Sequence, residues 1–378
     1  MEKHIFKNIK ENVSLLGFGL MRLPRLDPNK PEIDYDLATK MIDLAMKQGV
    51  TYYDTAFPYH DGLSEVFVGD ILSKYPRESY YLASKMPMWY INNLEDAKKT
   101  FELQLEKCKT PYFDFYLWHA LNKTTFQKGV DMGLFEFLLE KKKEGYIKHI
   151  GFSFHDDSYY LEEIAKKYPW EFAQIQLNYL DYEGSYNSKT QYETLLKYNI
   201  PAIIMEPVKG GTLATLNENA RLIFKEKEKD LSIASWAIRY ATSYSNVLVA
   251  LSGMSDMEQV KDNLNTMNNY KALTEDDYKT IKKATAQYLK SNIVPCTGCE
   301  YCLKGCPQKI EIPKIFKIYN SYCTNNDKDT FLKNYVPLLE VADKCIECNK
   351  CSKICPQGIK IPKRLVDIKD FYLSLIKE

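Results

Sequence analysis

Residues 36–54 read DLATKMIDLAMKQGVTYYD, a helix-patterned stretch that runs into a short apolar strand. The apolar face predicted for the helix carries Leu37, Met41, Leu44 and Ala45. These positions recur at the period of an amphipathic helix, and Gly49 is suited to end it. The run TYYD that follows is rich in aromatic residues, as strands often are. The stretch therefore predicts one helix and one strand of a repeating α/β fold.

The same alternation recurs between Leu15 and Leu251. Eight runs read as strands: LLGF (15–18), TYYD (51–54), YYLASK (80–85), FDFYLWH (113–119), IKHIGFS (147–153), FAQIQLN (172–178), PAIIM (201–205) and VLVALS (247–252). Apolar runs of this kind suit strands that are buried on both faces. Eight strand–helix units in about 250 residues predict a closed (β/α)8 TIM barrel. An open doubly wound sheet is the alternative, but LGFGLMRLP lacks the third glycine of the dinucleotide-binding fingerprint.

The charge balance excludes several classes of partner. The chain has 378 residues, with 51 Lys and Arg against 50 Asp and Glu. A near-zero net charge without long basic runs gives no electrostatic reason to bind nucleic acid or an anionic membrane surface. No stretch approaches the roughly 18 consecutive apolar residues of a membrane span, and the N-terminal residues lack an apolar signal region. We therefore expect a cytoplasmic protein.

Eight of the ten cysteines form an internal repeat. CTGCEYCLKGCPQKIEIPKIF starts at Cys296, and CIECNKCSKICPQGIKIPKRL starts at Cys345. Each copy has the spacing C-x-x-C-x-x-C-x-x-x-C-P, in which three close thiolates cap an iron-sulfur cube and the fourth ligates the cluster of the other copy. The predicted ligand sets of the two [4Fe-4S] clusters are Cys296, Cys299, Cys302 and Cys355, and Cys345, Cys348, Cys351 and Cys306. Zinc is the alternative, but it leaves the third cysteine and the proline of each copy unexplained.

The composition changes abruptly after Pro295. Thr274 and Asp277 have capping-box spacing at the start of a further helix that runs to Lys290. We therefore predict a barrel over residues 1–290 and a second domain over residues 291–378. The segment 312–344 between the cysteine copies is long and helix-patterned, which predicts a small, mainly helical two-cluster ferredoxin-like domain. The two cysteines outside the repeat, Cys108 and Cys323, are interpreted as packing residues.

Four titratable residues follow the predicted strands closely. Asp54 ends TYYD, Tyr59 lies in the next loop, Lys85 ends YYLASK and His119 ends FDFYLWH. In a barrel enzyme the chemistry belongs at the C-terminal ends of the strands. A tyrosine can protonate a carbonyl oxygen when a nearby ammonium lowers its pKa, and a carboxylate keeps that ammonium charged. Tyr59, Lys85 and Asp54 supply these three parts.

The motifs GFGLMRLP, DTAFPYHDGLSE, LASK, LWHAL, GFS and LSGMSDMEQVKDNL resemble those of the aldo-keto reductase superfamily over nearly the whole barrel. The cysteine repeat resembles the branch of that superfamily with a C-terminal ferredoxin-type 4Fe-4S domain. The resemblance implies an NAD(P)H-dependent oxidoreductase that reduces an aldehyde or ketone, with the hydride coming from the nicotinamide. It implies that Tyr59 is the general acid, that Lys85 and Asp54 tune it, and that His119 orients the substrate carbonyl.

The resemblance also implies a set of cofactor-binding residues. They are Ser153, Gln176, Met205, Glu206, Pro207, Val208, Gly210, Ser252, Gly253, Met254, Ser255, Gln259 and Asn263. The asparagine expected after Ser153 is Phe154 here, so one hydrogen bond is either missing or supplied elsewhere, with His155 as the candidate donor. Met205 replaces the aromatic residue that often stacks on the nicotinamide.

The adenosine end of the cofactor site departs from the family. The usual Lys and Arg for the 2′-phosphate of NADP fall on Gly253 and Gln259, so charge-assisted hydrogen bonds are lost. We therefore expect NADH to be favoured, or the preference between NADH and NADPH to be relaxed. Lys261 and Arg221 are the possible substitutes. Ser255 and Glu258 also have capping-box spacing, so this segment is alternatively a plain helix start.

Two functions follow from these motifs. The first is a reductase of a small-molecule carbonyl substrate, with clusters in a structural or electron-transfer role. The second is an electron-transfer component whose barrel binds nicotinamide as a redox or sensory ligand, while the clusters exchange electrons with a ferredoxin or partner enzyme. The complete set of four titratable residues favours catalysis. Apolar pocket walls are predicted from Phe18, Met21, Phe57, Trp89 and Trp118.

Overall fold

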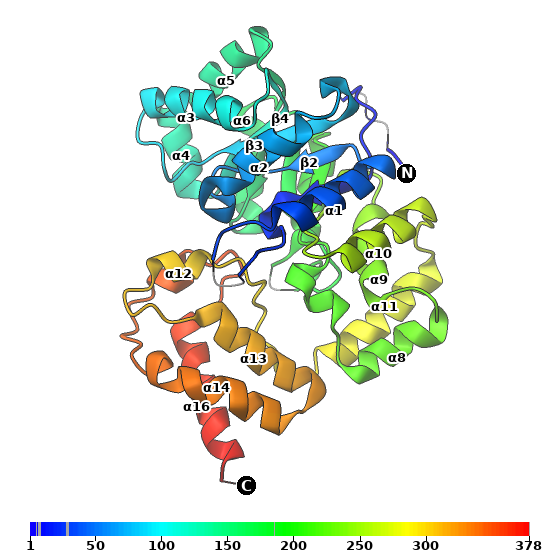
Figure 1. Ribbon diagram of the computed structural model, residues 1–378, viewed down its shortest axis with the longest axis vertical. Coiled ribbons are helices and arrows are strands. Elements are labelled where there is room, and N and C mark those ends of the chain that lie inside the picture. The colour runs from blue at the N-terminus through cyan, green and yellow to red at the C-terminus, as the bar shows by residue number, and fades with distance from the viewer. Residues whose placement is uncertain (5, 7–8, 28–29, 185, 378) are drawn as a thin grey trace. The chain divides into compact units, whose positions relative to one another are not determined.

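A closed barrel of eight parallel strands forms the centre of the first part of the chain (Figure 1). The computed structural model describes residues 1–4, 6, 9–27, 30–184 and 186–377. The strands are β1 (Leu16–Gly19), β2 (Tyr52–Asp54), β3 (Tyr81–Met86), β4 (Phe113–Leu121), β5 (Ile147–Phe154), β6 (Phe172–Gln176), β7 (Ala202–Met205) and β8 (Val247–Ser252). Pairing of Leu16 with Ala250 joins β1 to β8 and closes the barrel. The predicted barrel and all eight predicted strands are confirmed.

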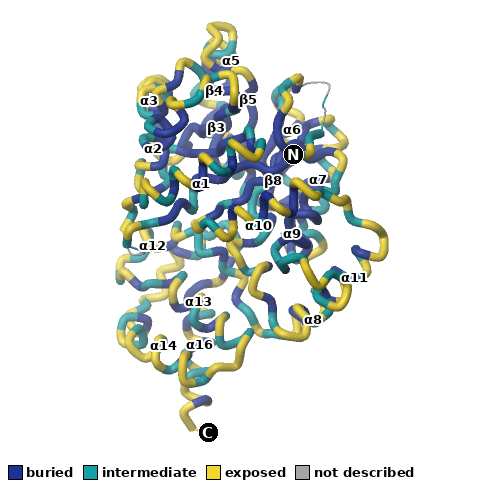
Figure 2. The backbone as a smooth tube through the Cα atoms, turned by 45° about the vertical axis from the view of Figure 1, so that its right-hand side comes forward, coloured by how far each residue is buried: buried dark blue, intermediate teal, exposed yellow. Residues whose placement is uncertain are grey.

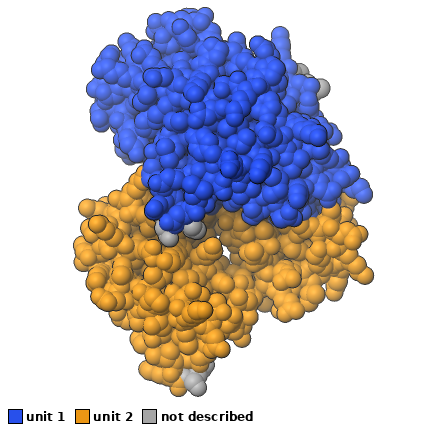
Figure 3. Space-filling model, in the orientation of Figure 1, with its two compact units in different colours: residues 1–207, 235–273 blue, residues 208–234, 274–378 orange. Residues whose placement is uncertain are grey.

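The chain separates into two compact units (Figure 3). Unit 1 comprises Met1–Pro207 and Ser235–Leu273, and unit 2 comprises Val208–Ala234 and Thr274–Glu378. Unit 2 thus includes helices α8 (Glu218–Lys227) and α11 (Glu275–Tyr288), which the sequence groups with the barrel. The predicted domain boundary at residues 290 and 291 stays a prediction.

The strands of unit 1 are buried beneath a layer of helices (Figure 2). These helices are α1 (Tyr35–Lys47), α2 (Leu63–Leu72), α3 (Leu94–Lys107), α4 (Lys123–Asp131), α5 (Leu134–Lys143), α6 (Leu161–Lys167), α7 (Ser188–Lys197) and α10 (Met257–Asn268), and α9 (Ile233–Thr242) begins two residues before the second segment of this unit. The buried face of α1 differs from the prediction. Ala38, Met41, Ile42 and Ala45 are buried, whereas Leu37 and Leu44 are only half-buried.

The cysteine repeat lies in a helical part of unit 2. Its helices are α12 (Tyr301–Gly305), α13 (Ile312–Asn325), α14 (Lys328–Ala342), α15 (Lys350–Lys353) and α16 (Ile361–Leu375). Pro313 and Pro362 stand in the first turn of α13 and α16, where a missing amide hydrogen costs the helix no hydrogen bond. Buried Phe316 and Tyr335 pack in the core of this part. The predicted helical character of the second domain is confirmed.

Two further predictions concern the start of α11 and the two cysteines outside the repeat. Thr274 and Asp277 form the predicted capping box at the start of α11. Cys108 is buried at the end of α3, and Cys323 on α13 is half-buried against the core of the cysteine repeat, as expected for packing residues. No helix among the described residues is long and apolar enough to span a membrane.

Candidate active site and cluster sites

Three of the four predicted catalytic residues meet through hydrogen bonds in unit 1. Asp54 ends β2, Lys85 lies near the end of β3, and Tyr59 begins the short 3-10 helix η2 (Tyr59–Gly62). Lys85 Nζ lies 2.6 Å from Asp54 Oδ1 and 3.3 Å from the Tyr59 hydroxyl, and it donates to the carbonyl oxygen of Thr55 at 2.8 Å. The lysine therefore links the carboxylate to the phenol.

Burial dominates the electrostatics of this group. Burial raises the pKa of the Asp54 carboxyl, and the charge of Lys85 opposes the rise. Burial lowers the pKa of Lys85, and Asp54 opposes that shift. Burial raises the pKa of Tyr59 well above its ordinary value, and the charges of Asp54 and Glu206 add to the rise while Arg22 opposes it. The lowering of the Tyr59 pKa that the sequence predicts is therefore not observed: the phenol is protonated at neutral pH, and burial makes its proton harder to donate.

His119 lies beside Tyr59, with 6.0 Å between the ring centroids. Burial lowers the pKa of His119 well below its ordinary value, and the charge of Lys85 adds to the shift, so the ring is neutral. Its Nδ1 is buried and has no hydrogen-bond partner in the described structure. Trp89 packs against this ring, with 4.8 Å between the centroids. A neutral imidazole beside the tyrosine is suited to orient a substrate oxygen.

The predicted pocket walls separate into two groups. Trp89 is 43% exposed and contacts His119, and Phe57 packs edge-on against Tyr90. Trp118, in contrast, is fully buried and packs against Phe126 and Trp170. The prediction that Trp118 lines the pocket is therefore wrong, because its side chain fills the layer between strands and helices.

The residues predicted for the nicotinamide end lie at the ends of β5 and β6. Ser153 Oγ accepts a hydrogen bond from the Ala120 amide at 2.7 Å, and Gln176 Nε2 donates to Asp181 at 2.5 Å. His155 follows β5, and burial together with the charge of Lys85 lowers its pKa to about 4. His155 is therefore neutral and able to make the hydrogen bond expected of the missing asparagine.

The residues predicted for the loop after β7 divide between the units. Met205 ends β7, Glu206 has a left-handed backbone with φ of 55°, and buried Pro207 is the last residue of the first segment of unit 1. Val208 and Gly210 belong to unit 2.

At the end of β8, Asn263 Nδ2 donates to Ser252 Oγ at 2.8 Å, and Met254 is buried. The cap of α10 is Asp256, whose carboxylate accepts from the Gln259 amide at 2.8 Å. The capping role considered for Ser255 is therefore wrong by one residue, since aspartate supplies the acceptor that a helix start prefers. Gln259 also donates to Asp256 at 2.7 Å. An acidic side chain thus occupies the helix end expected to receive the adenosine part of the cofactor.

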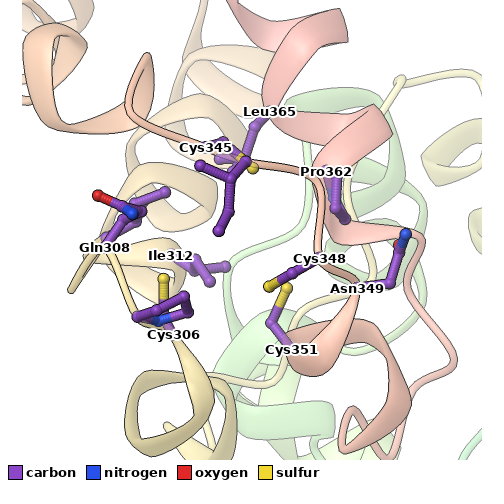
Figure 4. Close-up of a pocket in the computed structure, with 12 residues that line it drawn as sticks. Cys306, Gln308, Ile312, Cys345, Cys348, Asn349, Cys351, Pro362 and Leu365 are labelled. Carbon is purple, nitrogen blue, oxygen red and sulfur yellow. The ribbon is translucent and has the colours of Figure 1, made fainter.

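One cysteine set lines a pocket of unit 2 (Figure 4). Its four cysteines are Cys345, Cys348 and Cys351 from the second copy and Cys306 from the first. Figure 4 shows the side chains of Cys306, Cys348 and Cys351 gathered at the lower part of this pocket. The fourth cysteine of the first copy thus lies with the first three of the second.

The other set gathers around Cys302. Burial raises the pKa of the Cys302 thiol, and the thiols of Cys299, Cys296 and Cys355 raise it further. Cys302 therefore lies near the other three cysteines of its predicted set, Cys296, Cys299 and Cys355.

Sequence comparison agrees with the fold. The aldo/keto reductase family matches residues 15–286, which is most of the chain. The chain belongs to the aldo/keto reductase family. A 4Fe-4S dicluster domain matches residues 295–359, the part of this aldo/keto reductase that holds the cysteine repeat. The family shown here is the one that the sequence motifs resemble.

Several known proteins are similar to this aldo/keto reductase. An uncharacterized oxidoreductase, YqkF of Bacillus subtilis, is 26% identical over 73% of the chain and 94% of its own length. The L-galactose dehydrogenase of Arabidopsis thaliana is 24% identical over 73% of the chain and 91% of its own length. The aldo-keto reductase AKR11C1 of Bacillus halodurans in its holo form is similar in structure, with a TM-score of 0.64 and 24% identity over 75% of this chain and 96% of that one.

Two functional candidates of the reductase are not among the predicted residues. Buried Glu65 accepts from Ser84 at 2.7 Å and from Gln104 at 2.6 Å, and Gln104 also donates to the carbonyl oxygen of Lys85 at 3.1 Å. This hydrogen-bond network holds the backbone of Lys85 in place through its carbonyl oxygen. Glu65 stands in the quoted motif DTAFPYHDGLSE, so its position there was the available signal.

Arg22 is the second such residue. It follows β1 in the motif GFGLMRLP, and its guanidinium lies 3.4 Å from Glu206. A Cβ placed on Gly253 would lie 3.0 Å from Arg22 Cδ, so the arginine side chain runs closely along this glycine. The guanidinium-bearing side chain of Arg22 therefore lies beside Gly253 and Glu206.

Proposed function

We propose that this aldo/keto reductase reduces a small-molecule aldehyde or ketone to an alcohol with a nicotinamide cofactor. The observation that carries the proposal is the contact of the Tyr59 hydroxyl with Lys85, 3.3 Å away, while Lys85 is paired with Asp54. A protonated phenol beside a buried lysine is suited to donate a proton to an oxygen on which negative charge develops. Related aldo-keto reductases from Klebsiella pneumoniae carry NADPH or NADP, which supports a nicotinamide as the cofactor.

Each residue then has one task in the reaction. A bound nicotinamide supplies the hydride. Tyr59 donates its proton to the carbonyl oxygen, and Lys85 stabilises the negative charge left on the phenol. Asp54 holds Lys85 in place through the 2.6 Å contact. The neutral ring of His119, which lies beside Tyr59, orients the same carbonyl oxygen.

The residues present fit a dinucleotide without a 2′-phosphate. Ser153, Gln176 and neutral His155 offer polar groups for the carboxamide, and Arg22 offers a cation for the pyrophosphate. At the adenosine end, the Asp256 carboxylate would repel a phosphate. We therefore propose NADH as the preferred cofactor.

Gln259→Arg is expected to raise the affinity for NADPH by roughly 10-fold or more, because one charge-assisted hydrogen bond contributes about 1.5 to 3 kcal/mol. Wild-type protein is expected to bind NADH at least as well as NADPH. Both affinities are measured by fluorescence titration in the absence of a carbonyl compound.

Lys261→Gln is the control for this change, because Lys261 is already paired with Glu258 at 3.0 Å. We expect this substitution to leave the ratio of the NADPH and NADH affinities unchanged. A strong preference of the wild type for NADPH contradicts the proposal. If Arg22→Gln removes such a preference, the phosphate clamp belongs to Arg22.

The proposal assigns two [4Fe-4S] clusters to the domain that we place at residues 291–378. Cys296, Cys299, Cys302 and Cys355 would hold one cluster, and Cys345, Cys348, Cys351 and Cys306 the other. Thiolates supply the iron ligands, and each cluster supplies one-electron chemistry. A cytoplasmic location is part of the proposal, because reducing conditions keep ligand thiols from forming disulfides.

A panel of aldehydes and ketones tests the reductase proposal. We expect anaerobically purified holoprotein to oxidise NADH at a rate that depends on the carbonyl compound, with one mole of alcohol formed per mole of NADH. Apolar and aromatic carbonyl compounds are expected to be the better substrates, because Trp89 and Phe57 lie near His119 and Tyr90. Binding of NADH without turnover of any compound in the panel would instead support the electron-transfer alternative.

A further inference from the structure

The two copies of the cysteine repeat differ in exposure at equivalent positions. Thr297 and Ile346 each follow the first cysteine of their copy. Thr297 is 4% exposed, whereas Ile346 is 61% exposed. The second cysteine of each copy differs in exposure in the same way: Cys299 is half-buried and Cys348 is exposed. The second copy is therefore open to solvent at the place where the first is covered.

A loop of unit 2 covers the first copy. The 3-10 segment η5 (Lys209–Ala214) brings Gly210 so close that an added Cβ would lie 2.3 Å from the Thr297 carbonyl oxygen. Buried Lys209 donates to Gln357 Oε1 at 3.2 Å, and Gln357 stands two residues after Cys355. Both segments that supply ligands to the Cys302 set are thus in contact with η5. The Cys302 set is therefore the enclosed one.

Exposed lysines surround the open set. The pocket of that set is lined by Gln308 on one side and by Asn349 and Pro362 on the other (Figure 4). Each of these three residues is followed directly by an exposed lysine: Lys309, Lys350 and Lys363. In the described structure, none of the three lysines has an ion-pair partner. Glu311 is paired with Lys314, so Glu347 is the main opposing charge in these segments. The surroundings of the open set carry a net positive charge.

We propose that this surface docks an acidic one-electron carrier protein. We name it the lysine face and define it by Lys309, Lys350, Lys363 and Ile346. The inference rests on the clusters of the proposed function and adds the route by which electrons reach them. The lysines steer an acidic partner, and Ile346 provides the apolar contact at the centre of the interface. Cys348, which is exposed beside Ile346, brings the open cluster within reach of that partner.

The exchange involves a single electron and no atoms. The carrier loses one electron and the open cluster gains it, passing from its 2+ to its 1+ state, with no bond made or broken. The enclosed cluster lacks such a face, because η5 occupies the equivalent position. The direction of electron flow reverses when the carrier is oxidised and the cluster reduced.

The test is anaerobic stopped-flow reduction of the holoprotein clusters by reduced flavodoxin, an acidic one-electron carrier used as the probe. The variant combines Lys309→Glu, Lys350→Glu and Lys363→Glu. We expect its second-order rate constant at low ionic strength to fall about 10- to 100-fold and its dependence on salt to flatten or reverse. Electron paramagnetic resonance of the dithionite-reduced variant must show the wild-type clusters, which separates lost docking from lost folding.

The matched control combines Lys282→Glu, Lys317→Glu and Lys333→Glu, three exposed lysines on α11, α13 and α14 that change the net charge equally. We expect this control to stay within about twofold of the wild type. Equal slowing of the two variants, or of neither, overturns the lysine face.

Carbonyl reduction by NADH is measured on the same proteins, because none of the three lysines belongs to the barrel. If the triple variant keeps its carbonyl reduction but is reduced more slowly by flavodoxin, the result supports the lysine face as the docking surface. Failure of all carbonyl reduction in the wild type, with the flavodoxin rates as expected, contradicts the proposed function and leaves the surface supported.

Discussion

Tyr59→Phe is expected to lower kcat/KM for carbonyl reduction by roughly 10²- to 10⁴-fold, the usual contribution of a general acid. The change removes the hydroxyl that lies 3.3 Å from Lys85 and leaves the ring that packs against His119. Because burial raises the pKa of Tyr59, the wild-type phenol is protonated over the neutral range. The measurement is anaerobic NADH oxidation with the best compound of the carbonyl panel.

The control for this substitution is Tyr90→Phe. Tyr90 is 49% exposed and packs against Phe57. The substitution therefore removes a hydroxyl from the same region without changing a contact of Lys85. We expect Tyr90→Phe to keep activity near the wild-type level and both variants to bind NADH equally by fluorescence titration. Equal carbonyl reduction by Tyr59→Phe and wild type would remove Tyr59 from the proposed mechanism.

The barrel was predictable because its signal is repeated eight times along the chain. Strands that are buried on both faces read as continuous apolar runs, and β4 and β5 start at the predicted residues. The buried face of α1 was less predictable, because Ile42 and Leu44 are both apolar and only the packing decides between them. Ile42 is buried and Leu44 is half-buried. Hydrophobic period alone fixes a helix face to within about one residue.

The site was predictable where chemistry and position coincide in one motif. Asp54 and Lys85 end or nearly end adjacent strands, and strand pairing places Asp54 opposite Ala83, close to the lysine. Glu65 and Arg22 were missed because their roles depend on partners far away in sequence. Glu65 contacts Gln104, 39 residues away, and Arg22 contacts Glu206, 184 residues away. The motifs in which the two residues stand mark their positions, but not the distant partners that give them their roles.

The cysteine repeat has features that local sequence predicts and features that depend on contacts between distant residues. Its spacing predicts clusters from local sequence, whereas the exchange of the fourth ligand depends on the packing of the two copies. Cys306 lines the pocket of the second copy, and Cys355 contributes to the charge around Cys302. The covering of one copy by η5 has no counterpart in the repeat itself, since Thr297 and Ile346 occupy equivalent positions. The difference in exposure between the two copies is therefore visible only in the three-dimensional structure.

Cys306→Ala is expected to lower the iron content of the anaerobic holoprotein from about eight to about four per chain, because one cluster of four irons loses a ligand. Two double variants then identify which cluster is lost. Combining it with Cys345→Ala removes two ligands of the same cluster and is expected to leave about four irons. Combining it with Cys302→Ala removes one ligand from each cluster and is expected to leave almost none. Iron and acid-labile sulfide analysis measures both.

The reverse pattern identifies ligation within each copy. If Cys306 ligated the cluster of its own copy, the pair with Cys302→Ala would keep about four irons and the pair with Cys345→Ala would keep almost none. Cys323→Ala is the control, because this half-buried thiol bonds to the Asn292 carbonyl oxygen and lies outside both sets, so about eight irons should remain. Zinc in place of iron in the wild type would contradict both ligand sets. The exchanged pattern would mean that each cluster joins the two copies, so that loss of either fourth cysteine loosens the packing of α12 against α15 as well as the cluster.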